Sequence, residues 1–157
     1  MEFQTEIFSQ FDQNWGLLTA GNKEDFNTMT ISWGSLGTMW GKPVATVYIR
    51  PAKLTYDYMV RNDYFTISFY ATEYLPLLGV LGSKSGSEMD KMKTGLHVKD
   101  LDHSVTFEEA EVTLVCKKLL IQPLAVEDMS DEDVKLYYEE DMAHDMCIGE
   151  VVEILKK

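Results

Sequence analysis

The feature that most constrains the fold is an alternation of side chains with a period of two residues. It runs through three segments rich in β-branched and aromatic residues, Thr28–Trp33, Val44–Ile49 and Phe65–Tyr70. Because successive side chains of a strand point to opposite faces of a sheet, this period predicts β-strands. Other apolar stretches predict further strands over Leu17–Ala20, Val105–Phe107, Val112–Gln122 and Ile148–Leu155. The chain is therefore expected to be mainly β.

Helices are expected to be few and short. The predicted helical segments are about Lys53–Arg61 after Pro51, about Glu73–Val80, a short turn over Glu88–Lys93, and a helix with Ser130 as its N-cap and Asp133 three residues later. About seven strands with so few helices favour a closed or nearly closed antiparallel barrel, since closure removes exposed sheet edges. The length of 157 residues predicts one domain over residues 1–157.

The charge of the chain excludes some classes of partner. There are 14 Lys and Arg residues against 26 Asp and Glu residues, a net charge of −12, so neither nucleic acid nor an anionic membrane is an expected partner. Residues 1–99 carry a net charge of only −1 and residues 100–157 carry −11, so an anionic ligand remains possible in the first part. The acidic N-terminus lacks the features of a signal peptide, which predicts a cytoplasmic protein.

Motifs for side-chain catalysis or metal binding are missing from the sequence. It contains no G-x-S-x-G, no H-E-x-x-H and no G-x-G-x-x-G. Cys116 and Cys147 form no C-x-x-C pair, and His144 lies three residues before Cys147 without further spaced ligands. We therefore predict no metal site, and we expect a cofactor to carry any demanding chemistry.

The first candidate site is the segment Thr28–Trp33. If Met29, Ile31 and Trp33 face the core, then Thr28, Thr30 and Ser32 present a row of hydroxyl groups on the opposite face. Asn27 precedes this row and the segment Gly34–Gly37 follows it, an arrangement that lets a flat polar ligand approach both side chains and backbone. The alternative is a half-exposed strand without a ligand, whose threonines lie on the solvent-facing side and give the same pattern.

The second and third candidate sites are suited to an anion. Arg50 ends a predicted strand just before a predicted helix, and Lys53 and Thr55 follow it, so a guanidinium, a hydroxyl and the free N–H groups of a helix N-terminus come together. The loop over residues 82–86, followed by Asp90 and Lys91, combines Gly, Ser and a cation, although its order is not that of a P-loop. A solvated turn and a flexible connector are the alternatives.

These segments together resemble the flavin reductase-like proteins, the flavoredoxin branch of the FMN-binding split barrels. The run from Asn27 to Pro43 resembles the FMN-binding segment of that family. Four other stretches fit in order and spacing, over almost the whole chain: Trp15–Gly21, Arg50–Tyr56, Gly82–Lys91 and His144–Val152. The sequence departs from the family pattern at Cys147, where an aromatic residue is expected, and at Ser87–Glu88, where an Arg-Asp pair is common.

The resemblance implies a split β-barrel of antiparallel, Greek-key-like topology, a non-covalently bound FMN, and a homodimer with flavin sites near the subunit interface. It also implies which residues bind the cofactor. The residues implied are Asn27, Thr28, Met29, Thr30, Ser32, Trp33, Gly34 and Ser35 beside the flavin ring, Arg50, Lys53, Thr55 and Tyr56 near its phosphate, and Ser83, Lys84 and Ser85 over the phosphate or ribityl chain. Trp33 is a candidate wall for the ring, whereas Trp40 is expected to be structural.

The function that the resemblance implies is an FMN-dependent oxidoreductase. NADH or NADPH would reduce the flavin, which would pass electrons to a second flavin, a metal complex or a protein, and no acid–base residue is needed for the hydride step. One alternative is a non-catalytic electron carrier that holds FMN or haem. Another is a barrel that has lost its cofactor and serves as a dimeric structural module.

Overall fold

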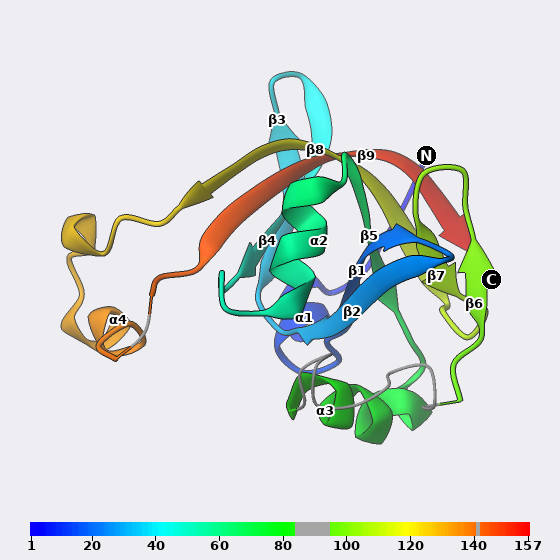
Figure 1. Cartoon of the computed structure of the whole chain (residues 1–157), viewed down its shortest axis with the longest axis horizontal. Helices are drawn as coiled ribbons and strands as arrows, with labels where there is room; N and C mark the ends of the chain where they lie inside the picture. The colour runs from blue at the N-terminus through cyan, green and yellow to red at the C-terminus, as the bar shows by residue number, and fades with distance from the viewer. Residues whose placement is uncertain (84–94, 141) are drawn as a thin grey trace.

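The computed structural model describes residues 1–83, 95–140 and 142–157 (Figure 1). Its main feature is a seven-stranded sheet with the order β2-β1-β5-β8-β9-β4-β3. The strands are β1 (Gly16–Asn22), β2 (Asp25–Ile31), β3 (Gly34–Met39), β4 (Lys42–Ile49), β5 (Tyr64–Phe69), β8 (Val112–Pro123) and β9 (Asp145–Lys156). All described pairs are antiparallel, and β6 (Val98–Asp100) and β7 (Val105–Phe107) form a small second sheet. The expectation of a mainly β, antiparallel fold is confirmed.

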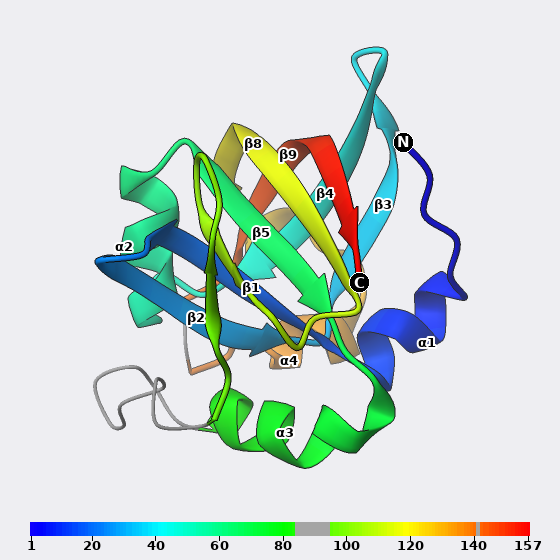
Figure 2. The same ribbon diagram turned by 90° about the vertical axis from the view of Figure 1, so that its right-hand side faces the viewer.

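The large sheet is strongly curved, so that its strands surround a common interior (Figure 2). Its two edge strands, β2 and β3, follow one another in the chain and are separated only by Ser32 and Trp33. The interior is filled by apolar side chains, among them Leu18, Ile49 and Phe65. Gly149 of β9 is required there, because a Cβ atom at this position would lie 2.6 Å from the ring of Phe65.

The helices are short. They are α1 (Ile7–Asp12), α2 (Leu54–Arg61), α3 (Leu75–Ser83), α4 (Glu132–Leu136) and the 3₁₀ turns η1 (Thr72–Tyr74) and η3 (Val126–Asp128). Helices α1, α2 and α3 lie against the barrel (Figure 1). Helix α2 packs on β1 and β2, and α3 packs on β2. A second apolar cluster, including Leu17 and Leu78, lies between α3 and the sheet.

The connection between β8 and β9, described over residues 124–140 and 142–144, forms an arm beside the barrel (Figure 1). Strands β8 and β9 pair along most of their length, and η3 and α4 lie in the connection between them, away from the barrel (Figure 1). The N-cap of α4 is Asp131, whose carboxylate accepts from the backbone N–H groups of Asp133 and Val134. The prediction of Ser130 as N-cap was therefore wrong by one residue.

The predicted strands are all present, but some elements were missed. The sequence stretch that forms β3 contains two glycines and was not predicted to be a strand. The predicted helices Lys53–Arg61 and Glu73–Val80 correspond to α2 and to η1 with α3, whereas Glu88–Lys93 lies outside the described residues. In the described ranges, no helix is long and apolar enough to cross a membrane.

Candidate functional site

A polar and aromatic cavity lies where β2 ends, β4 ends and β9 begins. Its volume is about 220 Å³. The lining residues are Met29, Thr30, Ile31, Ser32, Trp33, Tyr48, Arg50 and His144. The fold therefore brings the first predicted segment, Thr28–Trp33, next to Arg50 of the second.

The sheet register explains this convergence. Strand β4 lies between β3 and β9, with Val47 opposite Gly34 on one side and Ile49 opposite Asp145 on the other. The residues that follow β2, precede β9 and follow β4 therefore meet at one end of the sheet. His144 enters the site in this way, although sequence reasoning did not assign it a role.

The predicted row of hydroxyl groups is divided, since Thr30 and Ser32 line the cavity and Thr28 does not. Thr28 is buried, and its Oγ1 lies 2.8 Å from Oγ1 of Thr19 on β1. Thr30 donates its hydroxyl to the carbonyl of Leu78 in α3. Thr28 was predicted to face away from the core, and this was wrong, because its hydroxyl is buried against β1.

Trp33 was expected on the core face, and this was wrong. Its side chain is 40% exposed, because β2 ends at Ile31 and the alternation of the strand does not extend to position 33. The Trp33 ring packs edge-on against the Tyr137 ring, with 5.3 Å between the ring centres. The His144 ring is tilted against the Trp33 ring, with 5.1 Å between their centres. Trp40, expected to be structural, is 55% exposed in the turn between β3 and β4 and fills no core position.

Thr55 and Asn27 form a buried pair. Asn27 donates from Nδ2 to Oγ1 of Thr55 at 2.7 Å, and both side chains are buried. This bond ties the first turn of α2 to β2. The predicted contact of Thr55 with a phosphate stays a prediction, and the pair fixes where the N-terminus of α2 lies.

Tyr56 connects the same helix to the start of β9. Its hydroxyl donates to Oδ2 of Asp145 at 2.7 Å, and Asp145 is buried. This hydrogen bond to the carboxylate raises the pKa of Tyr56 to about 12, with help from partial burial. Tyr56 thus holds the segment that carries His144, while Lys53 stands exposed at the N-cap of α2.

Arg50 reaches across the cavity to the arm. Its guanidinium donates to the carbonyls of Met142 at 3.1 Å and Tyr137 at 3.2 Å, and it lies over the ring of Tyr138, 5.4 Å from its centre. Tyr138 in turn bonds to Nδ1 of His144 at 2.8 Å. The arm therefore covers one side of the cavity with aromatic rings.

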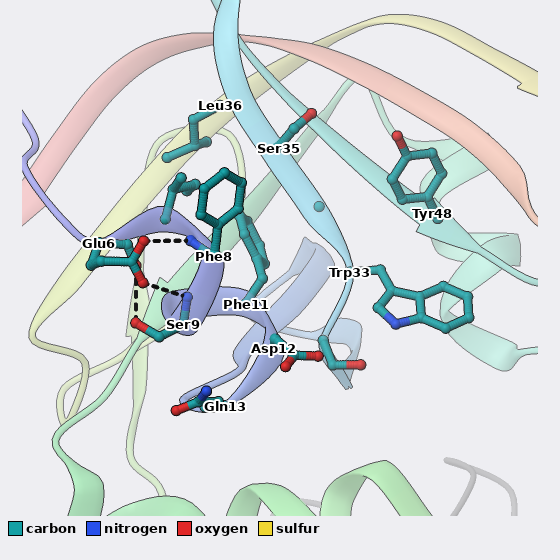
Figure 3. Close-up of a pocket in the computed structure, with 13 residues that line it drawn as sticks. Glu6, Phe8, Ser9, Phe11, Asp12, Gln13, Trp33, Ser35, Leu36 and Tyr48 are labelled. Carbon is teal, nitrogen blue, oxygen red and sulfur yellow. Dashed lines mark hydrogen bonds between the residues drawn. The ribbon is translucent and has the colours of Figure 1, made fainter.

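A larger groove continues from this cavity on the other side of Trp33 (Figure 3). It has a volume of about 690 Å³ and lies between α1 and β3. Ser32, Trp33 and Tyr48 line both the groove and the cavity, so the two are contiguous. Ser35 lines the groove and is exposed.

Gly34 lines the groove and also packs closely against α1. A Cβ atom at Gly34 would lie 2.7 Å from the ring of Phe11 in α1, so the missing side chain accommodates this aromatic ring. The packing of Phe11 is a second reason for a glycine at this position, and its predicted place beside a cofactor stays a prediction. Helix α1 had no clear sequence signal, and neither did the groove that it forms.

The third predicted segment begins beside β2. Gly82 packs against Thr30, since a Cβ atom there would lie 3.2 Å from the Thr30 Cβ. Ser83 ends α3 and donates its hydroxyl to the carbonyl of Val80 at 3.1 Å. Lys84 and Ser85 lie outside the described residues.

Neither thiol nor metal chemistry is indicated by the described parts of the chain. Cys116 and Cys147 are buried, and burial raises the pKa of both thiols, so neither is poised as a nucleophile. In the described residues no group of His, Cys, Asp or Glu side chains is arranged to hold a metal ion.

Comparison with known proteins decides the family. A sequence model described as the flavin reductase like domain matches residues 8–156, nearly the whole chain. The chain belongs to the flavin reductase-like family. The resemblance seen in the sequence is thereby confirmed. No curated protein matches the sequence.

Solved structures similar to this flavin reductase-like protein share its fold. A flavoredoxin from Methanosarcina acetivorans matches with 18% identity and a TM-score of 0.72, over 92% of this chain and 68% of that one. An FMN-binding protein from Thermus thermophilus, with bound p-hydroxybenzaldehyde, matches with 18% identity and a TM-score of 0.73, over 100% and 82%. A protein with a split barrel domain from Shewanella frigidimarina matches with 16% identity and a TM-score of 0.71, over 99% and 75%. The split-barrel fold is confirmed.

Proposed function

We propose that this protein binds FMN non-covalently in the contiguous cavity and groove and acts as an NAD(P)H-dependent flavin oxidoreductase. The observation that carries the proposal is the sharing of Ser32, Trp33 and Tyr48 by the two spaces. The groove of about 690 Å³ lies in the usual range for cofactor-sized ligands, and the smaller cavity extends it toward Arg50. Family membership supports the same cofactor.

The residues present suit the parts of an FMN molecule. Trp33 and Tyr48 offer aromatic surface to a planar ring, and Ser32 and Ser35 offer hydroxyl groups to its polar edge. Arg50, the exposed Lys53 and the N-terminus of α2 form a cationic end that suits a phosphate. Bound FMN would supply the hydride and electron chemistry.

Other residues of the predicted set act by positioning. The Asn27–Thr55 bond fixes the N-terminus of α2, and the Tyr56–Asp145 bond fixes the start of β9. The ring of Trp33 is held by its contacts with Tyr137 and His144. Such prior positioning lowers the ordering cost when a ligand binds.

A homodimer is part of the proposal. Phe8, which lines the groove, is 82% exposed, and Met39 and Trp40 at the outer end of the β3–β4 hairpin are 43% and 55% exposed. Exposed apolar residues beside an open groove are typical of a protein–protein contact. A second copy on this face would cover the groove and exclude water from the flavin ring. We place the dimer in the cytoplasm.

The test is a visible spectrum of the purified protein with FMN, followed by NADH or NADPH without oxygen. The expected result is a flavin spectrum that bleaches with either nucleotide at a catalytically useful rate. A flavin spectrum that only dithionite bleaches would assign the electron-carrier function instead. A protein that binds no FMN at excess would overturn the flavin proposal.

A further inference from the structure

A third cavity lies at the end of the molecule that carries β6 and β7. There the hairpin β6–β7 packs beside the C-terminal end of β9 and the start of β8 (Figure 1, Figure 2). The cavity has a volume of about 160 Å³. It shares no lining residue with the cavity and groove described above.

Positive charge is concentrated around this third cavity. Lys99, Lys156 and Lys157 line it, and Glu108 is the only acidic residue among its lining residues. Within the described ranges none of the three lysines forms an ion pair. Such a group of cations is unexpected in residues 95–157 of a chain whose net charge is −12.

Two buried hydroxyl groups face the same space. Thr106 and Thr113 are each 2% exposed, line the cavity, and place their Oγ1 atoms 2.8 Å apart. One hydroxyl donates to the other, so the accepting hydroxyl keeps a proton of its own. Over the described part of the chain, neither hydroxyl has another acceptor for that proton. A buried donor without an acceptor is costly, and an acceptor inside the cavity would satisfy it.

Strand register holds these groups together. Lys99 lies directly opposite Thr106 in the β6–β7 pair, which places both side chains on one face. Thr113 lies opposite Leu155 in the β8–β9 pair, which places these two side chains on one face, whereas Lys156 lies opposite Val112 and its side chain points to the other face. The backbone N–H of Lys157 donates to the carbonyl of Glu111 at 2.9 Å, which fixes the end of β9 beside the cavity.

We propose that this cavity binds a phosphate-class oxyanion, either inorganic phosphate or the phosphoryl group of a small metabolite. The ammonium groups of Lys99 and Lys157 supply charge, and the threonine pair supplies a directed hydroxyl donor. The volume equals that of about five liquid water molecules, enough for a tetrahedral oxyanion but not for a nucleotide. The site is independent of the proposed flavin site.

Amide NMR spectra of the full chain provide a residue-specific test. Inorganic phosphate and glycerol phosphate are titrated separately, against sodium chloride at matched ionic strength. We expect saturable shifts at the amides of Thr106, Thr113 and Leu155 with one or both phosphates but not with chloride. Saturation with inorganic phosphate assigns the free ion, and saturation with glycerol phosphate alone assigns a phosphoryl group of a larger ligand.

Variants then identify the binding groups. Lys99→Gln combined with Lys157→Gln should raise the dissociation constant at least about tenfold, and Thr113→Val should raise it several-fold. Lys23→Gln, an exposed lysine in the β1–β2 turn, is the matched control and should change nothing. If Thr113→Val does not fold, the exposed lysine pair decides alone. Equal shifts with chloride, no saturation, or an unchanged constant in the double lysine variant would overturn the proposal.

Discussion

Replacing Arg50 with alanine separates its role in the cofactor site from its role in the fold. The guanidinium donates to the carbonyls of Tyr137 and Met142, and these contacts are solvent-exposed. Water can replace the donor at both carbonyls, so we expect the free energy of unfolding to fall by less than about 1 kcal/mol. FMN binding should suffer more, because a charge-assisted bond to phosphate contributes roughly 1.5–3 kcal/mol.

That free energy corresponds to an increase of about 10-fold to 160-fold in the FMN dissociation constant. The assay is equilibrium titration of FMN, followed by the quenching of flavin fluorescence, beside urea unfolding of the same variant. Lys23→Gln removes a cation outside the site and serves as the control. Arg50→Lys should recover part of the affinity, because the charge returns without the fork of donors. An unchanged FMN dissociation constant in Arg50→Ala would remove Arg50 from the site and refute this reasoning.

Two further predictions concern the fold around the site. Gly149→Ala should lower the free energy of unfolding by about 1–3 kcal/mol, since its Cβ would lie 2.6 Å from the Phe65 ring, whereas Gly37→Ala has open space and should be nearly neutral in urea unfolding. Equal losses in the two variants would contradict the packing argument. The Tyr56 pKa of about 12 lies above the ordinary value near 10, so its bond to Asp145 stabilises fully below pH 10 and is lost as the pH rises toward 12. Tyr56→Phe should abolish that part of the alkaline loss, measured by urea unfolding at each pH, and an identical pH profile would speak against it.

The strands of this protein could be predicted from the sequence because their alternation is long and regular. The segment Phe65–Tyr70 illustrates this, since its apolar residues fall at every second position and its β-branched and aromatic residues favour a strand. The observed β5 buries both of its faces. Strand β3 could not be predicted, because Gly34 and Gly37 are poor strand formers taken alone. The strand forms because it pairs with β4.

The sequence singled out several residues that line the cavity and groove, but it did not reveal how their side chains are oriented. The sequence singled out Thr28 and Arg50. A period of two residues does not reveal that the Thr28 hydroxyl bonds to Thr19, or that the Arg50 guanidinium bonds to the arm. His144 could have been found, since the C-terminal stretch already matched the family pattern. The role of helix α1 follows from packing of Phe11 on Gly34, which no local signal reveals.

The measurement that tests the central claim most directly is residue-specific mapping of FMN binding by amide NMR. The account predicts saturable shifts at Thr30, Ser32 and Ser35, and at the indole N–H of Trp33, which together mark the shared wall of the cavity and groove. Binding without these shifts, or shifts confined to Thr106 and Thr113 in the third cavity, would contradict the account.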